Sequence, residues 1–145
     1  MDKRCGHWLR GAEALSEIGE RLIRVQIENR PAIDVIRLYD SKRTLFYCDP
    51  PYVHDTRGDA KAYGYEMTDE QHHVLAEVLN SVKGMVAFSN YECKLINRLY
   101  PSSRWQKIVG PERTNHSTKD VRVEVLWTNY DPTKMNRSQG VLEFA

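Results

Sequence analysis

The feature that most constrains the fold is a short apolar run that ends in two prolines. Thr44-Leu45-Phe46-Tyr47-Cys48 is nearly all apolar and leads directly into Asp49-Pro50-Pro51. Such a run, bounded by turn-forming residues, is typical of a strand buried on both faces in a parallel sheet. The prolines end the strand because each lacks the N–H group that a ladder needs. We therefore predict an α/β domain with Asp49 at the carboxyl end of one strand.

The remaining segments alternate between helical and strand patterns, which favours an α/β domain with a mixed sheet. Thr68 and Gln71 form a capping box that opens a helix. The last two strands are close in sequence and are expected to pair antiparallel. The expected helices cover residues 11–22, 31–39, 68–83 and 93–99, and the expected strands cover residues 24–27, 44–48, 85–89, 104–109 and 121–127.

The helical spacing also predicts which side chains face the core. Inward positions are expected at Ile33, Ile36 and Leu38 or Tyr39 in one helix, and at Val74, Leu75, Val78, Leu79 and Val82 in another. The adjacent His72 and His73 point about 100° apart on a helix, so they do not form a shared metal site. We expect both to lie on the solvated helix surface.

Composition narrows the class of protein. The chain has 145 residues, 41% hydrophobic and 28% charged, which fits one globular domain. Its three cysteines are far apart and form no CxxC pair, so a zinc site or a disulfide framework is not expected. The sequence contains neither a membrane-length apolar run nor a secretory signal, so we expect a cytoplasmic protein. The net charge of +1 neither supports nor excludes nucleic-acid binding.

The segment Asp49-Pro50-Pro51-Tyr52 carries the most specific chemistry. Pro50 biases Asp49 towards extended geometry, so the Asp49 carboxylate and the Pro50 carbonyl become two acceptors in a fixed relation. Two such acceptors suit the two hydrogens of an exocyclic amine such as that of adenine, and they stabilise positive charge developing on its nitrogen. Tyr52 offers a ring on which a base can stack, worth about 1–3 kcal/mol. A base in a duplex must be flipped out to reach such a pocket.

The same residues also allow a purely structural interpretation. A strand that ends in Asp-Pro-Pro is well terminated, and buried tyrosines are common in folded proteins. The four residues alone leave both interpretations open, and the buried run before them favours the functional one.

Leu45 to Tyr52 resembles the catalytic motif of the Dam-like adenine-specific DNA methyltransferases. Similar segments follow in the family's order over about residues 24 to 130. They are Val25 to Ala32 with Tyr39-Asp40, Met67 to His72 with Leu75-Ala76, Phe88 to Tyr91, and Glu124 to Tyr130.

This resemblance implies a fold, a cofactor and a set of site residues. The fold would be a partial Rossmann-like methyltransferase fold that uses S-adenosylmethionine and ends in an antiparallel strand pair. Asp49 and Pro50 would accept hydrogen bonds from the target amino group, and Tyr52 would stack on the flipped adenine of double-stranded DNA. In the family this segment also lines the cofactor pocket, so Asp49 and Pro50 are candidate cofactor contacts.

The sequence departs from the family in one respect. Family members carry a glycine-rich loop of the Phe-x-Gly-x-Gly type upstream, and nothing in this chain matches it. We therefore expect a C-terminal fragment, a truncated gene product or one half of a split enzyme, with an incomplete cofactor site. Residues 1–23 would be a remnant of the target-recognition region, 24–130 the catalytic half and 131–145 a tail. A second chain or another copy would complete the sheet.

Four basic residues are weaker candidates for DNA contact. Arg57 and Lys61 lie in the polar segment after the motif, and Arg113 and Lys119 lie in an expected loop between the last two strands. For Arg57 and Lys61, a loop that folds over the flipped base and simple exposure are equally compatible with the sequence. For Arg113 and Lys119, contact with phosphate and an ordinary solvated role are equally compatible.

Four other interpretations compete with adenine methylation of DNA. An RNA methyltransferase acting on the amino group of guanine also carries Asp-Pro-Pro followed by an aromatic residue, although the segments 68–76 and 128–130 argue against it. A glutamine-directed enzyme prefers Asn at the position of Asp49, and a cytosine-directed enzyme more often has Ser there. A noncatalytic remnant that still folds is the alternative outside enzymes.

Overall fold

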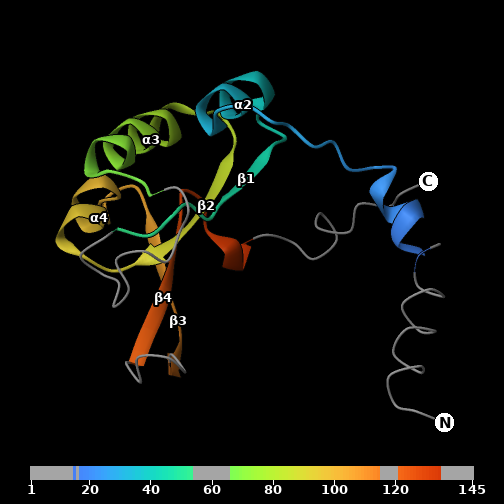
Figure 1. The fold of residues 1–145 in the computed structure, drawn as a ribbon. Coiled ribbons are helices and arrows are strands. Elements are labelled where there is room, and N and C mark those ends of the chain that lie inside the picture. The colour runs from blue at the N-terminus through green and yellow to red at the C-terminus, as the bar shows by residue number, and fades with distance from the viewer. Residues whose placement is uncertain (1–14, 16, 54–65, 115–120, 135–145) are drawn as a thin grey trace, which may run out of the picture. The chain divides into compact units, whose positions relative to one another are not determined.

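The structure is a computed structural model, and it describes residues 15, 17–53, 66–114 and 121–134 (Figure 1). The chain divides into two compact units, Met1–Pro31 and Ala32–Ala145. In the first unit, residues 17–22 are helical, in agreement with the helix expected there. The second unit contains the sheet and the motif that ends at Tyr52.

The second unit is built on a four-stranded mixed sheet with the order β1-β2-β4-β3. Its strands are β1 (Leu45–Cys48), β2 (Met85–Tyr91), β3 (Gln106–Thr114) and β4 (Val121–Thr128). β1 and β2 are parallel, with Cys48 opposite Phe88. β4 is antiparallel to both β2 and β3, so the predicted mixed sheet with a terminal antiparallel pair is confirmed.

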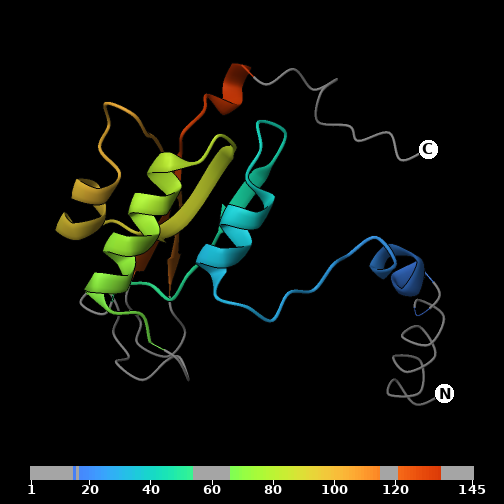
Figure 2. The same cartoon turned by 90° about the horizontal axis from the view of Figure 1, so that it is seen from above.

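Three helices cover one face of this sheet (Figure 2). They are α2 (Ala32–Tyr39), α3 (Asp69–Ser81) and α4 (Lys94–Leu99), and a short 3-10 helix, η2 (Pro132–Lys134), follows the last strand. α3 connects the two parallel strands and starts at the predicted capping box: the Thr68 hydroxyl accepts the Gln71 N–H, and the Gln71 side chain accepts the Thr68 N–H. The capping box fixes where α3 begins, at the end of the domain where β1 stops.

The core lies between the helices and the sheet. Phe88 of β2 stacks on Tyr100 with ring centroids 4.3 Å apart, and Tyr100 meets Trp105 edge-on at 4.9 Å. Leu79 of α3 and Trp127 of β4 are almost fully buried in the same cluster. Because side chains alternate across a strand, burial of Phe88 and Trp127 on the helix side directs Ser89 and Glu124 to the opposite face.

β1 differs from its prediction. It is parallel to β2 as expected, but it is an edge strand and only one of its faces is covered. Phe46 and Cys48 pack against the core, whereas Leu45 is 51% exposed and Tyr47 is 65% exposed. The prediction of burial on both faces was therefore wrong for the described residues.

Several smaller predictions were also wrong. Residues 24–27 form no strand, and β3 continues to Thr114 past an irregularity between Val109 and Glu112, where a loop was expected. Val74, Leu38 and Tyr39 are exposed rather than inward, whereas Ile36, Leu75, Val78 and Leu79 are buried as predicted. His72 was expected on the surface and is instead 1% exposed, because it lies on the face of α3 that packs on the sheet.

Candidate functional site

The segment Asp49-Pro50-Pro51-Tyr52 begins where β1 ends, at the carboxyl edge of the parallel strand pair. This is the edge at which open α/β sheets bind ligands. Asp49 is exposed, so its carboxylate is open to solvent, and both prolines are half-buried. The chain then turns so that Tyr52 and Val53 are buried.

Tyr52 is anchored at its hydroxyl by residues from two other strands. The hydroxyl lies 3.1 Å from Oγ of Ser89 in β2 and donates to Oε1 of Glu124 in β4 at 3.3 Å. The ring meets that of Tyr91 edge-on, with centroids 4.7 Å apart. The side chain of Tyr52 is only 7% exposed. Contacts at both the ring and the hydroxyl therefore fix the orientation of this side chain.

Burial is the main reason why the pKa of Tyr52 is raised well above its ordinary value. The hydrogen bond with Ser89 acts in the opposite direction, and the negative charges of Asp49 and Glu124 raise the pKa further. The Tyr52 hydroxyl therefore stays protonated throughout the neutral range and remains a hydrogen-bond donor. The Asp49 side chain is therefore among the groups that interact with this hydroxyl.

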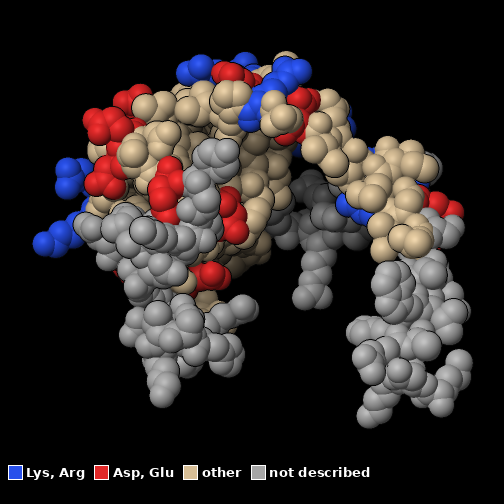
Figure 3. All heavy atoms as spheres, in the orientation of Figure 1, with Lys and Arg blue, Asp and Glu red and all other residues tan. Residues whose placement is uncertain are grey.

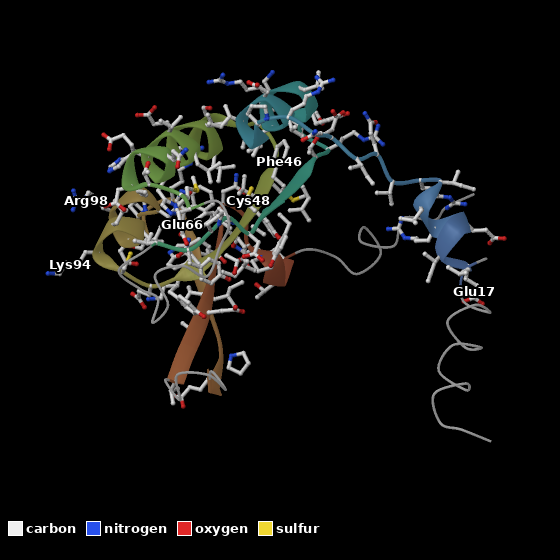
Figure 4. The ribbon with its side chains drawn as sticks, in the orientation of Figure 1. Glu17, Phe46, Cys48, Glu66, Lys94 and Arg98 are labelled. Carbon is white, nitrogen blue, oxygen red and sulfur yellow. The ribbon has the colours of Figure 1, made fainter. Side chains whose placement is uncertain are left out.

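The residue before Asp49 faces the other way. Cys48 packs towards the helices, as Figure 4 shows for Cys48 and Phe46 on β1. Burial raises the pKa of the Cys48 thiol to about 11, so the thiol is neutral at pH 7 and is a poor nucleophile. Cys48 acts as a small core residue, whereas the neighbouring Asp49 is exposed.

Two buried polar groups lie on the helix side of the sheet. The Asn90 side chain is fully buried, and its Oδ1 accepts the Tyr91 N–H. Among the described residues, neither Asn90 Nδ2 nor the Tyr100 hydroxyl has a hydrogen-bond partner. Burial strongly raises the pKa of Tyr100, so this hydroxyl is a neutral group in the core.

The candidate DNA contacts are only partly placed. Arg57, Lys61 and Lys119 lie outside the described residues, and Arg113 belongs to strand β3, opposite Arg122, rather than to a loop. On the face seen in Figure 3, the basic side chains of the described residues are interspersed with acidic ones instead of forming one patch. Lys94 and Arg98 point outward from α4 (Figure 4).

The described residues fit part of a cofactor site. The exposed Asp49 carboxylate and the adjacent Pro50 carbonyl are acceptors at the carboxyl end of β1, of the kind that the ammonium and hydroxyl donors of S-adenosylmethionine would need. In the described part of the chain, no three His, Cys, Asp or Glu side chains are grouped to hold a metal ion. None of its helices is long and apolar enough to span a membrane.

Sequence reasoning missed Ser89 and Glu124 as partners of Tyr52. Both lie in strands that were correctly predicted, on the face opposite the core residues. The available signal was the alternation of Val123, Val125 and Trp127, which places Glu124 on the other face. The strand order, which brings Glu124 beside Tyr52, has no local signal in the sequence.

The family of the chain follows from its sequence match. The family model of the D12 class N6 adenine-specific DNA methyltransferases matches residues 3–116, which is most of the chain. No curated protein matches the chain. The match includes the Asp49-Pro50-Pro51-Tyr52 segment and the parallel strands beside it. The chain therefore belongs to the D12 class of N6 adenine-specific DNA methyltransferases.

Proposed function

We propose that this chain carries the part of an adenine methylation site that binds the target amino group. We propose that it transfers a methyl group from S-adenosylmethionine to the exocyclic amino group of a flipped adenine in double-stranded DNA. The observation that supports this most is the exposed Asp49 carboxylate, placed at the carboxyl end of β1 beside a hydroxyl-anchored Tyr52. Family membership supplies the reaction class.

Asp49 and the Pro50 carbonyl would each accept one N–H of the amino group. This arrangement withdraws the nitrogen lone pair from the ring and favours a more tetrahedral nitrogen. S-adenosylmethionine supplies an electrophilic methyl group when it is bound. Asp49 and the Pro50 carbonyl would stabilise the positive charge that develops on the nitrogen when it takes the methyl group from the sulfur. Asp49 then takes the surplus proton, directly or through water, and leaves a neutral methylamino group.

Stacking on Tyr52 needs a local change. The ring is only 7% exposed and has Tyr91 against it, so a base can stack on Tyr52 only after the surroundings of the ring open. The fixed hydroxyl would keep the ring in place during that opening. Arg57, Lys61, Arg113 and Lys119 remain proposed phosphate contacts.

A labelling experiment tests this function. The purified chain is incubated with tritiated S-adenosylmethionine and duplex DNA, and the labelled nucleosides are separated by chromatography, with Asp49→Ala and Asp49→Asn as matched controls. Label on N6 of adenine that disappears in both variants is the expected result. Label on RNA guanine in a parallel arm would favour the RNA enzyme instead. Absence of label together with absence of cofactor binding by calorimetry would refute catalysis by this chain alone.

A second candidate is a chain that acts only together with another polypeptide segment, or that persists as a noncatalytic remnant. The edge position of β1, with Leu45 and Tyr47 exposed, favours this candidate because the strand presents unpaired backbone groups and apolar side chains. We propose that residues 24–130 are the catalytic half and that a segment carrying the glycine-rich loop lies outside these 145 residues. A second chain or another copy would pair with β1.

Sedimentation velocity tests the pairing of copies. If β1 edges pair, the native chain should sediment as a dimer or larger species in a concentration-dependent way. The Leu45→Lys/Tyr47→Lys variant should be monomeric, because charge at an edge strand opposes pairing. A native chain that stays monomeric at all concentrations would exclude the homo-oligomer and leave a different partner chain.

A further inference from the structure

We propose that Ser89 and Glu124 are positioning residues, which hold the Tyr52 ring through its hydroxyl in the orientation needed to receive the target base. This inference rests on the proposed function, because it assigns a purpose to the anchoring of Tyr52. It goes beyond that function by giving a role to two residues from different strands.

The hydrogen bonds define a direction. A tyrosine hydroxyl has one hydrogen, and here Tyr52 donates it to the Glu124 carboxylate at 3.3 Å. The Ser89 hydroxyl, 3.1 Å away, must then donate to the Tyr52 oxygen. The chain Ser89 to Tyr52 to Glu124 thus uses both the donor and an acceptor site of the Tyr52 hydroxyl. This restrains rotation of the hydroxyl as well as the tilt of the ring.

The three groups come from three neighbouring parts of the sheet. Tyr52 follows β1, Ser89 lies in β2, and Glu124 lies in β4 opposite Tyr91. Ser89 is buried and Glu124 is exposed, and both contact the same atom, the hydroxyl oxygen of Tyr52. Since β2 and β4 are paired with each other, the support for Tyr52 is rigid.

The position of this support matches the proposed reaction. The same hydroxyl lies near the Asp49 carboxylate, whose charge contributes to the raised pKa of Tyr52 after the larger effect of burial. A shift of the Tyr52 ring would therefore move a stacked base relative to Asp49 and to the Pro50 carbonyl. Small misplacements of reacting groups lower rates strongly even when binding is retained.

The variants test the Tyr52 ring and the hydrogen bonds of its hydroxyl separately. Tyr52→Phe keeps the stacking surface and removes the hydroxyl, Ser89→Ala removes the donor, and Glu124→Ala removes the acceptor. Glu124→Gln keeps a carbonyl acceptor and should partly rescue the function. Glu112→Ala, an exposed glutamate of the neighbouring strand β3, is the matched control. All are compared at a temperature where each variant is fully folded.

The first readout tests the anchor without any ligand. Carbon-13 labelling of tyrosine Cζ gives a resonance for Tyr52 that is assigned by its loss in Tyr52→Phe. We expect this resonance to shift in Ser89→Ala and in Glu124→Ala, and to stay in place in Glu112→Ala. An unchanged resonance in both Ser89→Ala and Glu124→Ala would overturn the proposal at its structural step.

The second readout tests the consequence for the base. The probe is a pool of duplexes with 2-aminopurine opposite an abasic site, because an unpaired base is extruded at lower cost. Stacking on Tyr52 should quench its fluorescence in the native chain, and the quenching should fall several-fold in Tyr52→Phe and Glu124→Ala, with duplex affinity changed less than twofold. Glu124→Gln should lie between, and Glu112→Ala should match the native chain.

The outcomes distinguish the two proposals. If the native chain binds and quenches the probe and the anchor variants do so equally, positioning by Ser89 and Glu124 is refuted while the proposed function stands. If the native chain does not bind the probe and gives no methyl transfer, both proposals fail together. Where methyl transfer is measurable, the anchor variants should lower kcat about tenfold with little change in KM.

Discussion

The carboxylate of Asp40 accepts the backbone N–H of Gly84, with Oδ1 3.0 Å from the nitrogen. It also accepts the N–H of Lys83, at 2.9 Å to Oδ1 and 3.1 Å to Oδ2. Asp40 immediately follows α2, and Gly84 immediately precedes β2. One side chain thus joins the end of a helix to the beginning of the strand that pairs with β1.

Removal of this carboxylate should destabilise the domain. In Asp40→Ala the two N–H groups lose their partner, and we expect the free energy of unfolding to fall by about 1–3 kcal/mol. Asp40→Asn keeps one acceptor oxygen and should cost less than half as much. Urea unfolding followed by tryptophan fluorescence gives both values. Equal losses of unfolding free energy in the two variants would show that the stabilisation depends on the negative charge of Asp40 and not on the position of its acceptor oxygens.

Gly84 should tolerate no side chain. A Cβ at this position would lie 2.8 Å from the Thr44 carbonyl oxygen and 3.0 Å from that of Ser41, and both are backbone atoms that cannot move aside easily. Because the Thr44 carbonyl also accepts the Met85 N–H at 2.9 Å, a shift there would disturb the start of β2. We expect Gly84→Ala to lose about 1–3 kcal/mol in urea unfolding.

Gly19→Ala is the matched control for Gly84→Ala. A Cβ at position 19 would meet no atom within 4 Å, and the glycine that it replaces lies in a helical segment. It should therefore leave the unfolding of the second unit unchanged. A similar loss of stability in the two variants would show that the close approach at Gly84 has no energetic effect.

The two buried tyrosines should respond in opposite ways to loss of the hydroxyl. Among the described residues the Tyr100 hydroxyl has no partner, so Tyr100→Phe removes an unsatisfied polar atom and should leave stability unchanged or raise it by about 1 kcal/mol. The Tyr52 hydroxyl has two partners, so Tyr52→Phe should cost about 1 kcal/mol. Thermal unfolding of both variants at equal concentration measures the contrast.

Cys48 should react slowly with iodoacetamide and with an unusual pH dependence. Its pKa is raised from 9.0 to about 11, so the thiolate fraction in the folded chain keeps rising up to that pH. At pH 9 about 1% of the folded thiol is ionised, against about half in the urea-unfolded chain, where the pKa returns to 9.0. Peptide mass spectrometry should therefore show a labelling rate that rises about tenfold per pH unit from pH 8 to 10 in the folded chain. A plateau near pH 9 would contradict burial of this thiol.

Most elements of the second unit could be predicted because their signals are local. The capping side chains of Thr68 and Gln71 satisfy backbone groups next to them, so they mark the start of α3 wherever it packs. The prolines at positions 50 and 51 end β1 through their own covalent structure. The motif residues Asp49, Pro50 and Tyr52 could be selected for the same reason, since they are contiguous.

Features that depend on distant neighbours could not be predicted in this way. Val25 and Ile27 alternate with polar residues as in a strand, but a strand needs a partner, and the structure gives them none. Burial of β1 on both faces was inferred from its composition, whereas Leu45 and Tyr47 on one of its faces are exposed. The meeting of Glu124 with Tyr52 depends on the strand order, which brings together residues 72 positions apart.

The placement of β4 has a consequence for synthesis of the protein. β4 is the last described strand in the sequence, yet it lies inside the sheet, between β2 and β3. While a ribosome is still making residues 121–128, the nascent chain already contains Asp49-Pro50-Pro51-Tyr52 but has only a two-stranded β1–β2 sheet, with Phe88 lacking the cover of Trp127. A premature stop before Val121 would therefore leave a polypeptide that keeps the motif intact and is a target for chaperones and proteases.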